Sequence, residues 1–461
     1  MEFGKKELVV EYNGKKALVC GMARSGIAAA KLLKKLGAEV ILQDMKKRED
    51  IAADVLNLEN EGIVLYTGAN PDDIACEQDI IVLSPGIPCD LPFIAAAEAA
   101  GVSVISEVEL AYGLTECPIT AITGTNGKTT TTTLTGEIMK AVYANTAVVG
   151  NIGISYSGEV ERLTEKDWVV AEISSFQMEK AKEFHPHISA VLNITPDHLN
   201  RHKTMEVYIA MKERVFEKQT AEDFCILNYG DEACRKMADK TAAKVFFFSS
   251  SEKLEEGIYL DGENIEVRWG AINETLINVN DLQILGVHNH ENVMAAAAMA
   301  ICANIPLDII RSVLKSFAGV EHRIEYVATV DGVDYYNDSK GTNVDASIRA
   351  VLAMKKPIVL IGGGYDKGGS FDEWTQLFPG RVKHLVLIGV TAPKVRESAE
   401  KFGFTAISDC ETFKEAVDLC REKAEDGDCV LLSPACASWG MFDNYEQRGD
   451  MFKEQVRGYL K

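Results

Sequence analysis

The chain has 461 residues, of which 47% are hydrophobic and 25% are charged, so collagen-like, disordered and disulfide-scaffold proteins are excluded. Its 48 Lys and Arg residues against 69 Asp and Glu residues give a formal net charge of -21, which disfavours non-specific binding to nucleic acid or anionic membranes. At about 100–200 residues per domain, this length allows two to four domains, and we expect three.

The N-terminal sequence lacks the apolar stretch and cleavage site of a secretory signal. The longest uncharged apolar run, 293–303, is far shorter than the ~20 residues that span a bilayer. Eleven scattered cysteines form no Cys-x-x-Cys pair, which favours reduced thiols. These observations predict a cytoplasmic protein without a membrane partner, and nothing in them requires an oligomer.

Residues 1–110 begin with a βαβ pattern typical of a small nucleotide-binding domain. A strand at 17–20 leads into the glycine turn 21–26 and a helix to Leu36, and a second strand ends near Asp44. Ala23 occupies the place of the second glycine of a dinucleotide fingerprint, which disfavours NAD and leaves other nucleotides open. Further on we predict a buried strand at 79–83, a turn at 84–88, a helix at 91–100 and a strand at 102–105.

The second predicted domain, 111–319, contains the strongest local signal. A strand at 118–122 runs into Gly124-Thr125-Asn126-Gly127-Lys128-Thr129, followed by a helix. In such a loop backbone N–H groups face phosphate oxygens, the lysine reaches the terminal phosphates and the threonine can bind Mg²⁺. The loop departs from the strict P-loop pattern because Ile122 stands where the first glycine would be.

Other polar residues of this domain follow predicted strands or lie on helices. Glu172 ends a strand at 168–171 and His198 follows one at 188–194, and both are hard ligands suited to Mg²⁺. Lys212 lies on a predicted helix at 204–218, where a solvent-exposed lysine is the simpler expectation. His185 and His187 flank Pro186 and are expected in solvent. Helices are predicted at 289–303 and 306–317, and hairpins at one sheet edge over 250–285.

A third domain, 320–461, is predicted from renewed alternation of strands and helices, which indicates a largely parallel sheet. Its strands are predicted near 333–337, 357–361, 384–388, 405–408 and 429–432. Polar loops at the strand ends contain His322-Arg323, Asp338 to Asn343, Gly362 to Lys367, and Ser433 to Ser438. Together these cations and hydroxyls indicate a clamp for carboxylate and phosphate, although each alone fits a surface turn.

Taken together, these motifs resemble the Mur ligase family over essentially the whole chain. The resemblance rests on Thr123 to Thr130, Asp197-His198, Asp338 to Asn343, and Ser433 to Ser438 continuing to Gly449. The last segment points to the family member that adds D-glutamate. Gly440 stands where the family often has an acid, and Tyr445 where some members have Phe.

The resemblance implies an α/β protein of three domains: an N-terminal Rossmann-like UDP-binding domain, a central P-loop ATPase with a mostly parallel sheet, and a Rossmann-like C-terminal domain. It implies ATP-dependent addition of D-glutamate to UDP-N-acetylmuramoyl-L-alanine through an acyl phosphate, a step of peptidoglycan precursor synthesis. The implied cofactors are ATP, two Mg²⁺ and a carbamylated lysine at Lys212, which replaces the surface interpretation of that residue.

The resemblance also assigns roles to individual residues. The implied catalytic and metal-binding residues are Lys128, Thr129, Glu172, His198 and carbamylated Lys212. ATP would contact Gly124, Thr125, Asn126, Gly127, Lys128, Thr129, Thr130, Asn289, Asn292, Arg323 and Asp338. The UDP-substrate would contact Arg24, Ser25, Asp44, Ser84, Gly86 and Asn151, and D-glutamate would contact Lys340, Lys367, Ser438 and Tyr445.

Two alternatives stay open at this point. A sister Mur or folylpolyglutamate-type ligase would share the fold but add another amino acid, although the segment Ser433 to Gly449 favours D-glutamate. A P-loop nucleotide switch that binds a partner and ligates nothing would leave the cations of the third domain unexplained. ATP turnover that ignores every amino acid would distinguish the switch.

Overall fold

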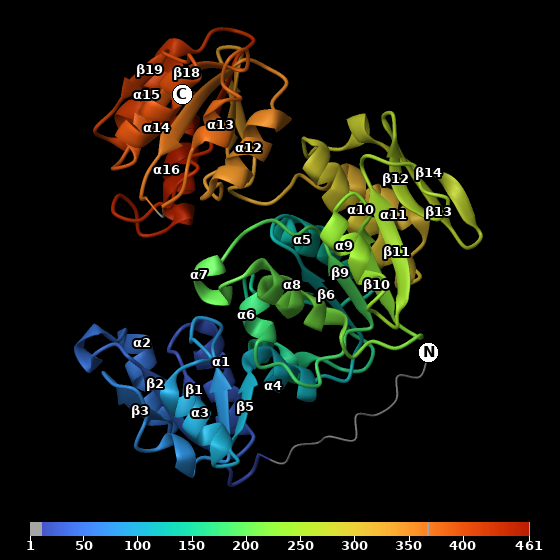
Figure 1. The fold of residues 1–461 in the computed structure, drawn as a ribbon, viewed down its shortest axis with the longest axis vertical. Coiled ribbons are helices and arrows are strands. Elements are labelled where there is room, and N and C mark those ends of the chain that lie inside the picture. The colour runs from blue at the N-terminus through green and yellow to red at the C-terminus, as the bar shows by residue number, and fades with distance from the viewer. Residues whose placement is uncertain (1–11, 367, 461) are drawn as a thin grey trace. The chain divides into compact units, whose positions relative to one another are not determined.

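The computed structural model describes residues 12–366 and 368–460. Three α/β domains follow one another along the chain, each built on its own sheet (Figure 1). By its internal contacts the chain divides into two compact units: Met1–Asn278 with Glu291–Val313, and Val279–His290 with Leu314–Lys461. The first unit contains the N-terminal and central sheets, and the second contains the C-terminal sheet.

The N-terminal sheet has five parallel strands in the order β3-β2-β1-β4-β5. Its central strand β1 is buried from Ala17 to Cys20, as expected for a parallel strand covered on both faces. The strands are β1 (Lys16–Cys20), β2 (Glu39–Asp44), β3 (Val64–Thr67), β4 (Ile80–Leu83) and β5 (Ser103–Ser106). The helices are α1 (Arg24–Lys35), α2 (Ala53–Leu56), α3 (Pro92–Ala99) and α4 (Glu107–Gly113).

The central sheet has nine strands in the order β14-β13-β12-β11-β10-β9-β6-β8-β7. Neighbours from β7 to β12 pair in parallel, whereas β13 and β14 add antiparallel strands at one edge, as the pattern of 250–285 predicts. The strands are β6 (Ile119–Thr123), β7 (Thr146–Gly150), β8 (Trp168–Glu172), β9 (Ile188–Val191), β10 (Phe224–Asn228), β11 (Lys244–Ser249), β12 (Gly257–Asp261), β13 (Asn264–Trp269) and β14 (Ile272–Asn278).

The helices of this region connect its parallel strands and follow the last hairpin. They are α5 (Lys128–Lys140), α6 (Ser175–Met178), α7 (Leu199–His202), α8 (Met205–Glu213), α9 (Glu232–Met237), α10 (Val287–Cys302) and α11 (Leu307–Ser316). The β6-loop-α5 connection places the loop 124–127 at the carboxyl end of a strand with parallel neighbours on both sides. Ligands of open α/β sheets bind at such strand ends.

The C-terminal sheet has six strands in the order β15-β16-β20-β17-β18-β19, all parallel except β15. Its strands are β15 (Glu325–Val330), β16 (Val333–Asn337), β17 (Ile358–Gly363), β18 (Val382–Ile388), β19 (Ile407–Asp409) and β20 (Cys429–Leu432). Its helices are α12 (Val344–Ala353), α13 (Asp372–Thr375), α14 (Ala392–Lys401), α15 (Phe413–Lys423) and α16 (Tyr445–Gly458). The α/β fold class with mostly parallel sheets is therefore confirmed.

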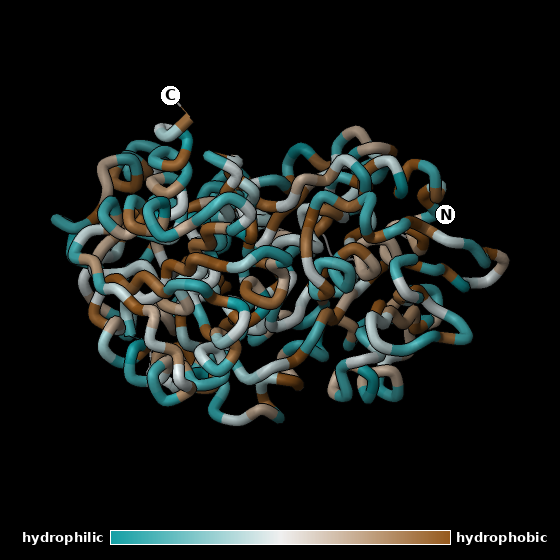
Figure 2. Tube along the Cα trace, turned by 90° about the horizontal axis from the view of Figure 1, so that it is seen from above, coloured by the Kyte–Doolittle hydropathy of each residue, from teal (hydrophilic) through white to brown (hydrophobic). Residues whose placement is uncertain are grey.

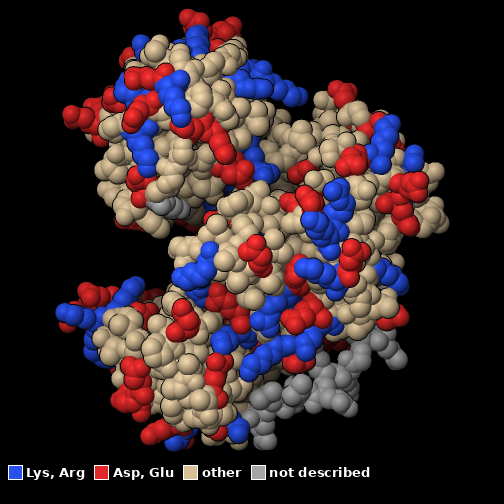
Figure 3. All heavy atoms as spheres, viewed as in Figure 1, with Lys and Arg blue, Asp and Glu red and all other residues tan. Residues whose placement is uncertain are grey.

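Figure 2 colours the chain by hydropathy, and hydrophilic segments predominate in its outer loops. On the face shown in Figure 3, acidic and basic side chains are interspersed over the surface, so the net charge of -21 is not concentrated in one patch there. Among the described residues, no helix has the length and apolar character that crossing a bilayer requires.

Candidate active site

The loop between β6 and α5 has a backbone that only glycine accommodates well. Gly124 has a φ of 145° and Gly127 a φ of 82°, both in the range that side-chain-bearing residues rarely adopt. A Cβ added at Gly127 would lie 2.3 Å from the Oδ1 of Asn292, on α10. The glycines therefore allow a tight turn that presents the N-terminus of α5, where backbone N–H groups favour an anion.

Three side chains from other elements brace this loop, and sequence analysis does not assign two of them to the site. The amide of Asn126 donates to the Oδ1 of Asn193 at 2.8 Å, and the Nδ2 of Asn193 donates back to the Asn126 carbonyl at 3.1 Å. The Tyr208 hydroxyl lies 3.1 Å from the Thr125 hydroxyl, and Thr131 donates to Asn292 at 3.1 Å. These hydrogen bonds thus hold the loop in place.

Two lysines meet at one carbonyl of the loop. Lys128 donates to the carbonyls of Gly124 and Thr125, both at 2.8 Å, and Lys212 donates to the same Gly124 carbonyl at 2.7 Å. Lys212 is only 2% exposed, so the simpler expectation of a solvent-exposed helical lysine is wrong. Burial, followed by the charge of Lys128, holds the pKa of Lys212 well below its usual range.

The carboxylate of Glu172 is buried at the end of β8. The Nδ2 of Asn151 donates to its Oε1 at 2.8 Å, while its Oε2 is buried without a hydrogen-bond partner. A buried carboxylate oxygen without a donor is costly, and a cation would compensate it. The residues present therefore fit a divalent cation.

No group of three or more His, Cys, Asp or Glu side chains is placed to hold a metal anywhere in the described part of the chain. A cation at Glu172 would consequently need oxygen ligands of other kinds. Thr129, on the first turn of α5, and Lys212 as a carbamate are the side chains of the predicted set that would supply oxygen.

His198 lies on a strained loop. Its φ is 53°, its side chain is half exposed, and its Nε2 lies 3.5 Å from the Oδ2 of Asp197. Its ring contacts Phe176 edge-on, with centroids 4.8 Å apart. A residue with a side chain rarely has positive φ, and such strain is common at functional sites.

Five of the six residues predicted to bind the UDP-substrate lie at the carboxyl ends of the N-terminal strands or in the segments that follow them, whereas Asn151 follows β7 of the central sheet. Asp44, at the end of β2, accepts a hydrogen bond from the amide of Met22 at 2.8 Å and so fixes the glycine turn. The Ser84 hydroxyl lies 3.5 Å from the Gly21 carbonyl, and Arg24 donates to the Gly153 carbonyl at 3.1 Å. Ser25 is half-buried and Gly86 is exposed on this edge.

In the second unit, two of the residues predicted to bind D-glutamate, Lys340 and Tyr445, contact each other although they are far apart in sequence. Lys340 donates to the Tyr445 hydroxyl at 2.6 Å, with its Nζ 4.0 Å from the centre of that ring. Ser438 is buried, and its carbonyl accepts from the amide of Phe442 at 3.1 Å. Lys367 lies outside the described residues. Asn289, predicted to contact ATP, donates from its side chain to the Leu285 carbonyl at 2.7 Å.

Arg448, which sequence analysis names only within a motif, is fully buried beside this cluster. Its guanidinium donates to the hydroxyl and carbonyl of Ser339 at 2.9 and 2.7 Å, and to the Cys436 carbonyl at 3.3 Å. Arg448 directly precedes Gly449, at the end of the segment on which the family resemblance rests, and that position is the signal that could have found it. It joins the two loops that carry the polar residues of this unit.

Asp338 directly follows β16 and is fully enclosed. Burial raises its pKa to about 7, although the Ser433 hydroxyl, which donates to its Oδ2 at 2.7 Å, and the charge of Arg323 act to lower it. From about pH 4 to 7 the folded protein therefore holds a proton that the unfolded chain has released. Stability should fall as pH rises through this window.

We expect Asp338→Asn to remove this fall, which at its upper limit is about 4 kcal/mol for three pKa units. The measurement is the thermal unfolding midpoint from pH 5 to 8. Asp334 on the same strand is the matched control: burial acts to raise its pKa, but hydrogen bonds from Lys356 and Thr329 lower it. Asp334→Asn should lose stability mainly above pH 4. An unchanged pH slope in Asp338→Asn would contradict the assignment.

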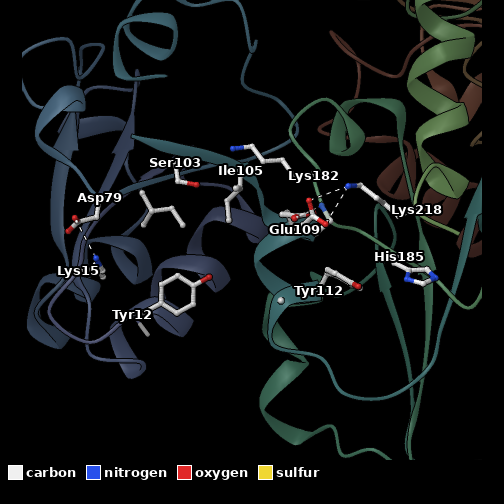
Figure 4. A pocket seen from close by; sticks show the side chains of 13 residues that line it. Tyr12, Lys15, Asp79, Ser103, Ile105, Glu109, Tyr112, Lys182, His185 and Lys218 are labelled. Carbon is white, nitrogen blue, oxygen red and sulfur yellow. Dashed lines mark hydrogen bonds and ion pairs between the residues drawn. The ribbon is translucent and has the colours of Figure 1, made fainter. Parts of the chain in front are cut away.

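One cavity of about 660 Å³ is lined by none of the predicted site residues (Figure 4). It is bounded by Lys15 and Asp79, which precede β1 and β4, and by Ser103 at the start of β5, so it lies at the amino ends of the N-terminal strands. His185, on its rim, and His187 are not simply solvated: both pair with Asp223, at 2.7 and 3.2 Å, and His187 is buried. The cavity is thus separate from the edge that carries Ser84 and Asp44.

Comparison with known protein families matches all three domains. Residues 15–106 match the Mur ligase MurD-like N-terminal domain, residues 122–300 the Mur ligase middle domain, and residues 322–436 the Mur ligase glutamate ligase domain. Together these regions cover most of the chain.

Curated relatives match along nearly the full length. UDP-N-acetylmuramoylalanine--D-glutamate ligase of Lachnospira eligens is 50% identical over 447 residues, covering 97% of this chain and 99% of the relative. The enzyme of the same name from Clostridioides difficile is 46% identical with the same coverage. UDP-N-acetylmuramate-alanine ligase of Thermotoga maritima shares the fold, with a TM-score of 0.62 at 18% identity over 96% of this chain and 99% of that one.

These matches, with the glycine loop and its lysine, define an ATP-dependent ligase that forms amide bonds. The chain belongs to the Mur ligase family.

Proposed function

We propose that this ligase adds D-glutamate to UDP-N-acetylmuramoyl-L-alanine with hydrolysis of ATP to ADP and phosphate, a step of peptidoglycan precursor synthesis. Relatives named for this reaction, 44–50% identical over 97% of the chain, carry the proposal. The substrate carboxylate attacks the γ-phosphate and releases ADP. The D-glutamate amine then attacks the acyl carbon of the resulting acyl phosphate, loses a proton and displaces phosphate, leaving the amide.

The glycine loop would bind the phosphates of ATP. Its N–H groups and the N-terminus of α5 supply donors, and Lys128 would exchange its two loop carbonyls for phosphate oxygens. In the second unit Arg323 and Asp338 would contribute to nucleotide binding, as would Asn289, while Asn292 braces the loop. These contacts would lower the barrier by positioning reactants and neutralising charge.

Glu172, Thr129 and His198 would hold Mg²⁺, which neutralises phosphate charge when bound. The buried Oε2 of Glu172 supports this role, and Asn151 fixes the other oxygen. Lys212 would be carbamylated, since its lowered pKa favours the neutral amine that reacts with carbon dioxide. Carbamylation would convert this buried amine into an anionic oxygen ligand.

D-glutamate would bind through its carboxylates to Lys340 and Lys367, near Ser438 and Tyr445. The hydrogen bond from Lys340 to Tyr445 supports a prearranged ammonium in this pocket. Arg24, Ser25, Asp44, Ser84 and Gly86 would bind the UDP-substrate at the carboxyl edge of the N-terminal sheet, and Asn151 would contact it from the central domain. We further propose a monomeric enzyme of the cytoplasm, where ATP is available and thiols stay reduced.

Mass spectrometry of the product tests this reaction. Incubation of the enzyme with UDP-N-acetylmuramoyl-L-alanine, ATP, Mg²⁺ and D-glutamate should convert the substrate to one species heavier by a glutamyl residue. Omitting ATP is the control and should leave the substrate unchanged. A product that contains no glutamate would refute the proposal.

A further inference from the structure

Arg201 occupies an unusual place beside the His198 loop. It lies on α7, a single-turn helix between His198 and Lys203, whose φ values of 53° and 69° are both left-handed. Two strained residues bounding so short a helix require tertiary contacts to hold it. The side chain of Arg201 is 18% exposed, so its guanidinium is largely removed from water.

The guanidinium makes hydrogen bonds in two directions. On one side, its Nε and Nη2 donate to the two carboxylate oxygens of Glu179 at 3.0 and 2.6 Å. On the other, its Nη1 donates to the Pro85 carbonyl at 3.1 Å and its Nη2 to the Ile87 carbonyl at 2.9 Å. Glu179 belongs to the central domain, whereas Pro85 and Ile87 form the turn after β4 of the N-terminal domain. Arg201 thus connects the two domains of the first unit.

The two carbonyls that Arg201 holds lie on either side of Gly86. A trans peptide is planar, and the described backbone has no cis peptide bond, so the N–H of Gly86 points away from the Pro85 carbonyl and hence away from Arg201. Gly86 itself has no side chain to fix its peptide planes, and a Cβ built there would meet no atom within 4 Å. Arg201 therefore fixes the orientation of this turn through its carbonyls, on the side opposite the N–H of Gly86.

A single aromatic ring ties this contact to the His198 loop. The guanidinium carbon of Arg201 lies 4.4 Å from the centroid of the Phe176 ring. The same ring contacts His198 at 4.8 Å and His202 at 5.3 Å. His202 is in turn buried and hydrogen-bonded to Ser175 at 2.9 Å, so Arg201 lies between two aromatic contacts of the central domain.

We infer that Arg201 is a positioning residue for the sugar-nucleotide substrate: it holds the turn 84–88 against the His198 loop in the orientation that binds the substrate. Lysine cannot replace it, because one ammonium cannot make a bidentate contact with Glu179 and reach both carbonyls. The inference rests on the proposed binding of the UDP-substrate at Ser84 and Gly86.

The test compares Arg201→Lys with Arg214→Lys. Arg214 donates to carbonyls of the same segment, Glu179 and Ala181, but its hydrogen bonds lie within the central domain, so it is a matched control. Arg201→Lys should raise the KM for UDP-N-acetylmuramoyl-L-alanine about tenfold, with a smaller change in kcat, and weaken its calorimetric Kd without ATP or metal by a similar factor. The KM for D-glutamate should stay within twofold, and Arg214→Lys should change none of these constants.

Two further variants make the result decisive. Glu179→Gln keeps the size of the side chain but removes its charge, and it should raise the same KM by a smaller factor. This variant serves as the test if Arg201→Lys folds poorly. Ser84→Ala should raise it through the binding turn itself. An unchanged KM in Arg201→Lys with a raised KM in Ser84→Ala would overturn the role of Arg201 alone. An unchanged KM in both would overturn the placement of the substrate at this turn and the inference with it.

Discussion

Replacing Lys128 by alanine is expected to lower kcat by about a thousandfold. The ammonium group of Lys128 is held 2.8 Å from two carbonyls of the glycine loop, at the N-terminus of α5. Phosphate oxygens in that loop would replace the carbonyls, and without the lysine the charge that develops on the transferred phosphoryl group would lose a direct partner. Steady-state phosphate release measures the effect.

Lys140 on the same helix provides the matched control. It is exposed and pairs only weakly with Glu137, three residues away, at 3.0 Å. Lys140→Ala should retain wild-type kcat within a factor of two. If Lys128→Ala keeps more than a tenth of wild-type kcat while circular dichroism shows an intact fold, Lys128 does not act on the phosphates.

Replacing Lys212 by alanine is expected to lower kcat about a hundredfold or more, with partial recovery on addition of formate or acetate. A small carboxylate could enter the space of the lost side chain and supply the oxygen ligand that the carbamate would provide. The measurement is amide formation with and without the added anion. Lysine has no such oxygen without the modification, so the recovery tests carbamylation itself.

Lys218, exposed and paired with Glu183, is the control for this variant, because its replacement removes a lysine close in sequence. Lys218→Ala should be fully active and insensitive to formate. Full activity of Lys212→Ala, or loss of activity that no carboxylate restores, would argue against the carbamate.

The sequence predicts the interior of the fold better than its edges. The buried strands β1, β6 and β20 are found from continuous apolar runs. Three strands that sequence analysis misses, β3, β7 and β15, lie at sheet edges. The exposure of β15 alternates along the strand, whereas β3 and β7 are apolar runs of only three or four residues, which are too short to distinguish a strand from a helix segment. The interior strands β10 and β11 are missed as well, although their runs Cys225–Leu227 and Val245–Phe248 carry the signal.

The residues of the candidate site also differ in how far the sequence predicts them. The glycine loop and its lysine can be predicted because their chemistry depends on neighbours in sequence. The hydrogen bonds from Asn151 to Glu172 and between Tyr208 and Thr125, and the contacts of Arg201, join segments 21 to 116 residues apart, so only the folded chain reveals them. The burial of Lys212 belongs to the same class, since its helix alone predicts an exposed side chain.

The proposed substrate specificity is tested most directly by phosphate release from ATP in the presence of UDP-N-acetylmuramoyl-L-alanine. Four parallel reactions receive D-glutamate, L-glutamate, L-lysine or no amino acid. We expect sustained turnover with D-glutamate and at most a few per cent of that rate in the other three. Equal turnover in all four, or faster turnover with another amino acid, would contradict it.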